Sequence, residues 1–283
     1  MSDVKTLKSI DISSYTIIST GIGVLFAVLA SIIGLIGIGI LSSAAIGVMA
    51  YLIPTIVIGT LMASIYASFA EGYLYNWLAK RMNPITFELE NGSEIKQISP
   101  VPTALIISII TTILVILTYA VSMFIVPLLL SSMIQTLMFS GQTALAYSLY
   151  QITMIISQPS VIALLIVGSF IISFVFTLIS LFIYNYLGKM GKGISVDLSR
   201  ENAMTTLNSI NPVSLIIVCG VINLILNIIT SIIMMISGAD VASAVSNIIS
   251  GLISGVIGGA LFAVFYNFLA PKLGKLNVEL IDN

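Results

Sequence analysis

The sequence predicts an all-α polytopic membrane protein with six transmembrane helices, arranged as three repeated helical hairpins that short cytoplasmic β-strands link. Two observations carry this prediction. The ten Lys and Arg residues fall into four short clusters, and between the clusters the chain is almost free of charge. The last three clusters each open with the dipeptide Tyr-Asn, which indicates one unit present three times.

Composition excludes a water-soluble fold. The chain is 58% hydrophobic and 7% charged, whereas the surface of a soluble protein needs about a quarter of its residues charged. With a net charge of -1 and no polybasic tail, nothing favours nucleic acid as a partner. The single cysteine, Cys219, lies in an apolar stretch and can form no intrachain disulfide.

The apolar intervals predict two membrane spans in each repeat, because each interval is long enough to cross the bilayer twice. Long continuous apolar runs favour helices over barrel strands, which would alternate polar and apolar residues. The expected repeats are 1–91 with spans 15–40 and 48–79, 92–202 with spans 103–130 and 160–187, and 203–283 with spans 213–236 and 244–269.

The basic clusters predict the orientation in the cell membrane. Since the chain crosses twice between clusters, all four lie on one side, and basic loops mark the cytoplasmic side. Both termini are therefore expected in the cytoplasm. The uncharged insertion 131–159 then lies outside, where Leu145, Leu149, Ile152 and Ile156 share one helical face. This pattern favours a helix on the outer membrane surface over a re-entrant segment.

Short strands are predicted after each Tyr-Asn, because apolar and polar residues alternate over 85–89, 194–198 and 276–280. Asn91-Gly92 predicts a tight hairpin into the next repeat. By extension, 276–280 is expected to pair with 4–10 and close a ring without a free edge. The apolar strand faces should meet the helices and leave Glu88, Asp197 and Glu279 in water.

The flanking motifs carry a family resemblance. An entry such as Ile98-Ser99-Pro100 or Ile210-Asn211-Pro212, two spans, and the exit Tyr-Asn-x-Leu-Gly/Ala-Lys resemble a family of small prokaryotic two-span membrane proteins of unknown function, here in triplicate. The first repeat departs from the pattern at Asn83-Pro84 and the third at Pro271. The resemblance implies topology and assigns no chemistry.

No enzymatic activity, cofactor or metal site is expected, because the chain lacks histidine, a cysteine pair and the common catalytic motifs. One intramembrane acid stands out. Glu71 follows Gly59, Ala63 and Ala67 at intervals of four, so it shares a face of small residues and should point into the bundle. A structural role is favoured, with an ion or proton site as the alternative.

Three asparagines, Asn76, Asn185 and Asn267, recur at the ends of the second helices. They could ring the mouth of a pore, but hydrogen bonding to a neighbouring helix or strand is favoured, with the preceding tyrosines anchored at the lipid headgroups. In the last hairpin, Asn223 and Asn227 share one face of the fifth span and a glycine row lies on the sixth, which together favour tight packing over a polar translocation path. That row is Gly251, Gly255 and Gly259.

These features together favour a scaffold, accessory subunit or membrane organiser without enzymatic activity. The alternative is a channel or small-solute or ion transporter along a pseudo-threefold axis, since transporters are often built from internal repeats. The expected partners are membrane lipid and either another membrane protein or a second copy of this chain.

Overall fold

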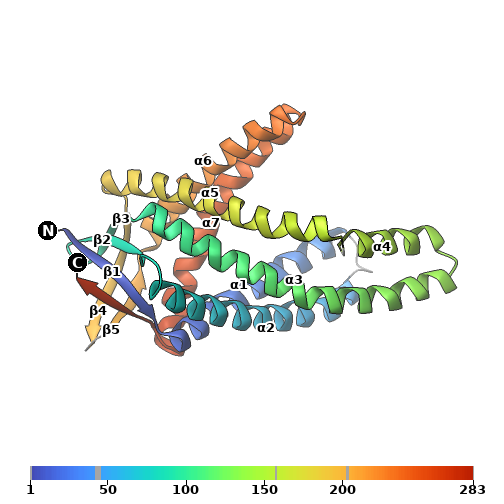
Figure 1. The fold of residues 1–283 in the computed structure, drawn as a ribbon, viewed down its shortest axis with the longest axis horizontal. Helices are drawn as coiled ribbons and strands as arrows, with labels where there is room; N and C mark the ends of the chain where they lie inside the picture. The colour runs from blue at the N-terminus through green and yellow to red at the C-terminus, as the bar shows by residue number, and fades with distance from the viewer. Residues whose placement is uncertain (1, 42–45, 157, 202–203, 283) are drawn as a thin grey trace. The chain divides into compact units, whose positions relative to one another are not determined.

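The computed structural model describes residues 2–41, 46–156, 158–201 and 204–282. Six of its helices are long and apolar enough to cross a membrane. Their ribbons are labelled in Figure 1. They are α1 Ile12–Leu41, α2 Ile46–Ala79, α3 Pro100–Phe139, α5 Pro159–Lys189, α6 Pro212–Ile236 and α7 Val241–Leu273.

The six helices begin and end within four residues of the predicted spans at all but one end. The third was expected to end at residue 130, but α3 continues through Pro127 and Leu130 to Phe139. At about 1.5 Å per residue, its 40 residues reach about 60 Å, roughly twice the hydrocarbon thickness of a bilayer. The insertion therefore begins as an extension of α3 and continues into α4, Thr143–Ile156.

The fold is not all-α, because six strands form a closed antiparallel barrel in the order β1-β2-β3-β4-β5-β6. Every strand pairs with a neighbour on both sides. The strands thus form a structural element of their own, a barrel, and do not merely connect the helical hairpins. They are β1 Ser2–Ile10, β2 Thr86–Glu90, β3 Glu94–Ile98, β4 Ile194–Glu201, β5 Met204–Ile210 and β6 Leu276–Asp282.

The expected closure of the ring is confirmed. The C-terminal strand β6 pairs with the N-terminal strand β1, with Leu280 opposite Leu7 and Val278 opposite Ile10, so the two chain ends are neighbours (Figure 1). The hairpin between β2 and β3 turns at Asn91 and Gly92, which both have positive φ, 51° and 70°, as tight hairpins require.

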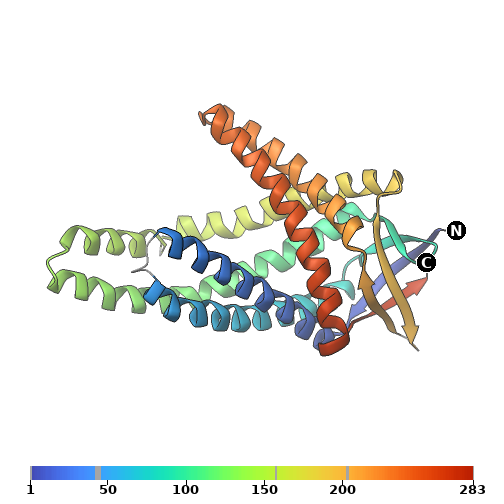
Figure 2. The ribbon, with the colours of Figure 1, turned by 180° about the vertical axis from the view of Figure 1, so that it is seen from behind.

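Apolar strand residues face the helices. Leu207 lies opposite Leu198 on one side and Leu276 on the other, and cross-strand partners share a face of a sheet. This leucine row packs against a buried cluster that includes Ile18 of α1 and Tyr266 of α7. Helices α6 and α7 continue as a close pair beyond the barrel (Figure 2).

The three acidic strand residues differ in exposure. Asp197 is exposed as expected, but Glu88 and Glu279 are half-buried. Glu279 is partly covered because its carboxylate bonds Lys8 Nζ at 2.7 Å and Ser9 Oγ at 2.9 Å on the paired strand. The expectation that all three lie free in water is corrected for Glu88 and Glu279.

The chain divides into two compact units. One contains residues 1–103 and 178–283, with the barrel, and the other is 104–177. The expected repeat boundaries, 91/92 and 202/203, do not separate compact units, because strands from all three segments pair in one barrel. In the second unit, α4 buries Ala146 and exposes Leu145 and Ile152.

Candidate functional site

The three recurring asparagines make the same pair of hydrogen bonds. Each side-chain amide accepts from the backbone N–H and donates to the backbone carbonyl of a single isoleucine at the end of a strand. The N–H bonds to Oδ1 measure 2.8, 2.8 and 2.9 Å, and each return bond measures 2.8 Å. The pairs are Asn76 with Ile10, Asn185 with Ile98, and Asn267 with Ile210. Each amide thus replaces a neighbouring strand at this position.

The tyrosine before each asparagine bonds strand backbone. Tyr75, Tyr184 and Tyr266 are 4%, 3% and 2% exposed, and their hydroxyls donate to the carbonyl oxygens of Leu7, Ile95 and Leu207. The hydroxyls of Tyr184 and Tyr266 also accept from the first N–H of β4 and of β6, at 3.4 and 3.3 Å. The three tyrosines are therefore buried and hydrogen-bonded to strand backbone. They do not anchor the protein at the lipid headgroups, because backbone groups satisfy their hydroxyls.

A second set of bonds recurs where each strand enters a helix. The residue after the strand donates its N–H to a carbonyl of another strand at 2.8 to 2.9 Å, and an N–H returns from that strand residue to a serine hydroxyl at 3.0 to 3.1 Å. The backbone pairs are Asp11 with Asn277, Ser99 with Thr86, and Asn211 with Ser195; the hydroxyls belong to Ser14, Ser99 and Ser214.

These entry contacts were missed in the sequence, although a signal was present. Asp11 and Ser14, like Asn211 and Ser214, have the spacing of helix N-caps, and both cap residues accept from the first turn of their helix. A capping residue forms hydrogen bonds with the first turn of its own helix. The capping pattern therefore does not reveal that the same residue also bonds a strand. We call the two sets together the strand–helix junctions.

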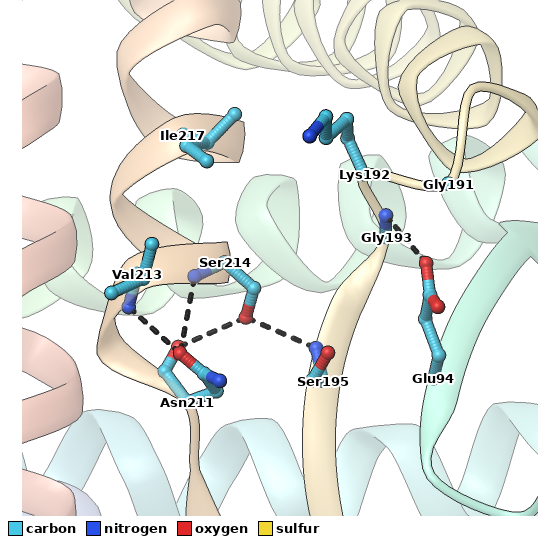
Figure 3. Close-up of a pocket in the computed structure, with 9 residues that line it drawn as sticks. All are labelled: Glu94, Gly191, Lys192, Gly193, Ser195, Asn211, Val213, Ser214 and Ile217. Carbon is cyan, nitrogen blue, oxygen red and sulfur yellow. Dashed lines mark hydrogen bonds between the residues drawn. The ribbon is translucent and has the colours of Figure 1, made fainter.

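One junction borders a cavity of about 180 Å³. Figure 3 shows Ser214 accepting from the N–H of Ser195 while it donates to the carbonyl of Asn211, and the Glu94 carboxylate accepting from the N–H of Gly193 at 2.9 Å. Most polar groups of this pocket thus form hydrogen bonds within the protein. The ammonium of Lys192 is directed away from Glu94 (Figure 3).

Two glycines near this pocket lie close to the backbone of β3. A Cβ on Gly188 would lie 1.8 Å from the carbonyl oxygen of Lys96, and one on Gly193 would lie 2.3 Å from that of Ile95. Only glycine permits such an approach without displacing the backbone. The positions that match Gly188 in the other two motifs are Ala79 and Ala270, which carry a Cβ.

The intramembrane acid, Glu71, is half-buried and accepts a hydrogen bond from the Tyr15 hydroxyl of α1 at 2.7 Å. It therefore faces the neighbouring helix. The small residues that precede it lie differently, because Gly59 and Ala63 are exposed and a Cβ on Gly59 would meet no atom within 4 Å.

The row of small α2 residues that faces α1 is a different one, shifted by one position along the chain from the row that contains Gly59. A Cβ on Gly23 of α1 would lie 2.6 Å from the Ser64 hydroxyl, and one on Gly72 would lie 3.4 Å from the Tyr15 ring. The row is Thr60, Ser64, Ser68 and Gly72. This corrects the packing expected of Gly59 and Ala63. Both rows consist of small residues at intervals of four, so composition does not distinguish them.

The glycine row of α7 lies directly against α6. Cβ atoms on Gly251, Gly255 and Gly259 would fall 2.2 Å from Asn227 Cγ, 2.5 Å from the Cys219 carbonyl oxygen and 2.9 Å from the Leu215 carbonyl oxygen. The Asn223 and Asn227 amides donate to carbonyls four residues earlier in α6, at 2.9 and 2.8 Å. The asparagines therefore pack on the glycines while their amide N–H groups bond their own helix.

A polar contact between α6 and α7 had no counterpart in the sequence prediction. The Asn247 amide lies 3.0 Å from the Ser231 hydroxyl and 3.1 Å from that of Thr230, and Ser231, fully buried, donates to the Ala244 carbonyl at 2.9 Å. Such bonds between membrane helices contribute about 0.6 to 2 kcal/mol each. They reinforce the glycine packing.

In the described part of the chain, no three His, Cys, Asp or Glu side chains are grouped so as to hold a metal ion. The chemistry of the junctions is hydrogen bonding between side chains and strand backbone. Comparisons with protein-family models, with curated proteins and with solved structures find no significant match to this chain.

Proposed function

We propose that this protein is a membrane scaffold, accessory subunit or membrane organiser without enzymatic activity. One observation carries the proposal: the amides of Asn76, Asn185 and Asn267 bond strand backbone through both their oxygen and their nitrogen. An amide engaged in this way is not available to coordinate a permeating solute. The recurring polar residues instead join helices rigidly to a barrel, which suits a platform for other membrane components.

The junctions also support a triplicated two-span unit, related to the small prokaryotic family that the motifs resemble. Each Tyr-Asn pair bonds the entry strand of its own repeat, whereas each helix-entry residue bonds the exit strand of the preceding repeat. The chain therefore alternates bonds within a repeat and between repeats, and the last repeat bonds the first. Pseudo-threefold organisation is the arrangement that accounts for this alternation.

We place the barrel and both termini on the cytoplasmic side of the cell membrane. All ten basic residues belong to the strands or to helix ends and turns that adjoin them, whereas the turn between α6 and α7 carries only Asp240. Basic segments resist translocation across the membrane.

Copurification tests the scaffold directly. The chain would be purified from its native membrane in mild detergent, and retained proteins identified, with the Tyr184→Phe variant as a matched control that weakens a junction. A partner present in near-stoichiometric amount, and reduced in the control, is the expected result. A wild-type protein that retains no partner, and that carries ion flux in liposomes, would contradict the proposal.

A transport function is the alternative, and one feature of α1 favours it. The hydroxyls of Thr16, Thr20 and Ser31 are buried without a hydrogen-bond partner among the described residues, and Tyr15 of the same helix donates a hydrogen bond to Glu71 of α2. Buried hydroxyls of this kind can hold water or a cation. If Glu71→Gln leaves the fold intact but abolishes a proton or cation flux in liposomes, transport replaces the scaffold.

A further inference from the structure

The ten basic residues divide into two sets by their surroundings. Four lie on strands and form ion pairs with strand carboxylates, within the barrel itself. Lys8 Nζ is 2.7 Å from Glu279 and Lys96 Nζ is 2.5 Å from Glu90, while Lys5 and Arg200 share Asp282. The strand carboxylates of Glu279, Glu90 and Asp282 thus already have cations of their own.

The other six are the helix-end cations, which lie at the C-terminal ends of α2, α5 and α7 or in the turns that follow. They are Lys80, Arg81, Lys189, Lys192, Lys272 and Lys275. All six are exposed. Within the described part of the chain, none has a carboxylate oxygen within 4.0 Å, although Lys275 bonds the Asn208 side chain at 2.8 Å. The segments that hold them, 75–83, 184–193 and 266–275, contain no Asp or Glu.

Aromatic rings lie beside two of these cations. The Arg81 guanidinium lies 4.3 Å from the centroid of the Trp77 ring, and the Lys272 ammonium lies 3.1 Å from that of Phe268. Trp77, Phe268 and Tyr186 are 41%, 53% and 67% exposed. Exposed aromatic rings at the ends of apolar helices mark the headgroup level of a bilayer, so the helix-end cations lie at the depth of lipid phosphates.

The helix dipole explains only part of this arrangement. It favours a cation in the last turn of a helix and fades beyond it, yet Lys192 and Lys275 lie past the helix ends. Lys192 in particular extends over the pocket of Figure 3, with its ammonium directed away from Glu94. A local counter-ion within the protein therefore does not account for the set.

We propose that the helix-end cations bind the phosphate headgroups of anionic phospholipids in the leaflet next to the barrel. Six exposed cations without a carboxylate partner among the described residues, at helix ends that carry exposed aromatic rings, are complementary to a negatively charged lipid surface. The same surface would disfavour contact with the strand carboxylates, so it would hold the barrel at the membrane by its helix-end side. This inference does not depend on whether the protein is a scaffold or a transporter.

Lipid selection by the full-length protein tests the proposal. The protein would be reconstituted in vesicles of equal phosphatidylglycerol and phosphatidylcholine, extracted in mild detergent, and its retained phospholipids quantified. Wild type should retain phosphatidylglycerol several-fold over phosphatidylcholine, and the enrichment should fall at high salt, because salt screens exposed charges.

Two triple variants, each of which removes three positive charges, distinguish the helix-end cations from the strand cations. Lys80→Gln, Lys189→Gln and Lys272→Gln together should reduce the enrichment toward one, whereas Lys8→Gln, Lys96→Gln and Arg200→Gln together should retain it. Equal enrichment in both variants, or wild-type enrichment that salt leaves unchanged, would overturn the proposal. The salt series on wild type decides the matter even if a triple variant fails to fold.

A soluble anion is the remaining outcome. If inorganic phosphate at millimolar concentration raises the melting temperature of the detergent-purified protein as much as phosphatidylglycerol does, the cations bind a free anion, and the lipid proposal is wrong.

Discussion

At the scale of single residues, the junction side chains take the place of strand backbone. Asn185 offers the Ile98 backbone one acceptor and one donor, and Tyr184 offers a hydroxyl to Ile95. Since both partners are strand backbone groups, losing a side chain leaves an N–H or a carbonyl without its bond, at a cost of about 1–3 kcal/mol when the group is buried. The tyrosine hydroxyl should therefore contribute to the free energy of unfolding in addition to the burial of its ring.

Tyr184→Phe tests this at nearly constant volume. Removing the hydroxyl should lower the free energy of unfolding by about 1–2 kcal/mol, because the Ile95 carbonyl loses its donor. Tyr186→Phe is the matched control, since that side chain is 67% exposed and should change little. Thermal unfolding of both variants in detergent measures the difference, and equal melting temperatures would show that the hydroxyl adds no net stability.

At the scale of elements, the α6–α7 hairpin depends on the absence of side chains along one face of α7. Gly255→Ala would place a methyl group 2.5 Å from the Cys219 carbonyl oxygen of α6. Because backbone atoms cannot move aside as a side chain can, we expect destabilisation of about 1–3 kcal/mol.

Gly258→Ala is the control on the same helix, because a Cβ there would meet no atom within 4 Å. Alanine forms helices better than glycine by up to about 1 kcal/mol, so this variant should be as stable as wild type or more so. Denaturation in a detergent series compares the two. A Gly255→Ala protein as stable as Gly258→Ala would contradict the close approach of the helices.

The seam between β1 and β6 should be sensitive to acid. Hydrogen bonds from Lys8 and Ser9 lower the pKa of Glu279, and bonding to Lys5 lowers the pKa of Asp282. A carboxyl group whose pKa is lower in the folded state adds stability above its unfolded pKa of about 4. That stability is lost as the pH falls through the folded pKa.

We therefore expect the melting temperature to fall between pH 5 and pH 3, values that bracket the ordinary carboxyl pKa of about 4. Lys8→Gln should make that fall shallower, because Glu279 then loses the cation that lowers its pKa. Both proteins would be measured across the same pH range in one detergent. An identical pH dependence would exclude the Lys8–Glu279 pair as a contributor.

At the scale of the whole molecule, the barrel joins the two ends of the chain and collects the basic residues on one side. In the proposed orientation, a cysteine at Ser93, in the β2–β3 turn, faces the cytoplasm, whereas one at Gln142, before α4, faces outward. In a Cys219→Ser background and in intact cells, an impermeant thiol reagent should label only the cysteine at position 142. Labelling at position 93 alone would invert the topology.

Local patterns were enough to predict the spans, the strands and the closure of the ring. Charge clusters and apolar lengths are properties of contiguous segments, as is the two-residue period of strands such as 194–198. Repetition of the motifs then extended one hairpin, at Asn91-Gly92, to the pairing of β6 with β1. The spans and strands needed only residues close together in the chain, whereas the closure of the ring also needed the motifs to recur along it.

The tertiary structure decided what depends on distant partners. Composition could not choose between the rows that contain Gly59 and Thr60, since both are small; the contact between Gly23 and Ser64 selects the second. The burial of Tyr184 and the second role of Ser14 likewise follow from strands far along the chain. A side chain's partner is set by which backbone folds beside it, and a local period carries no information about that neighbour.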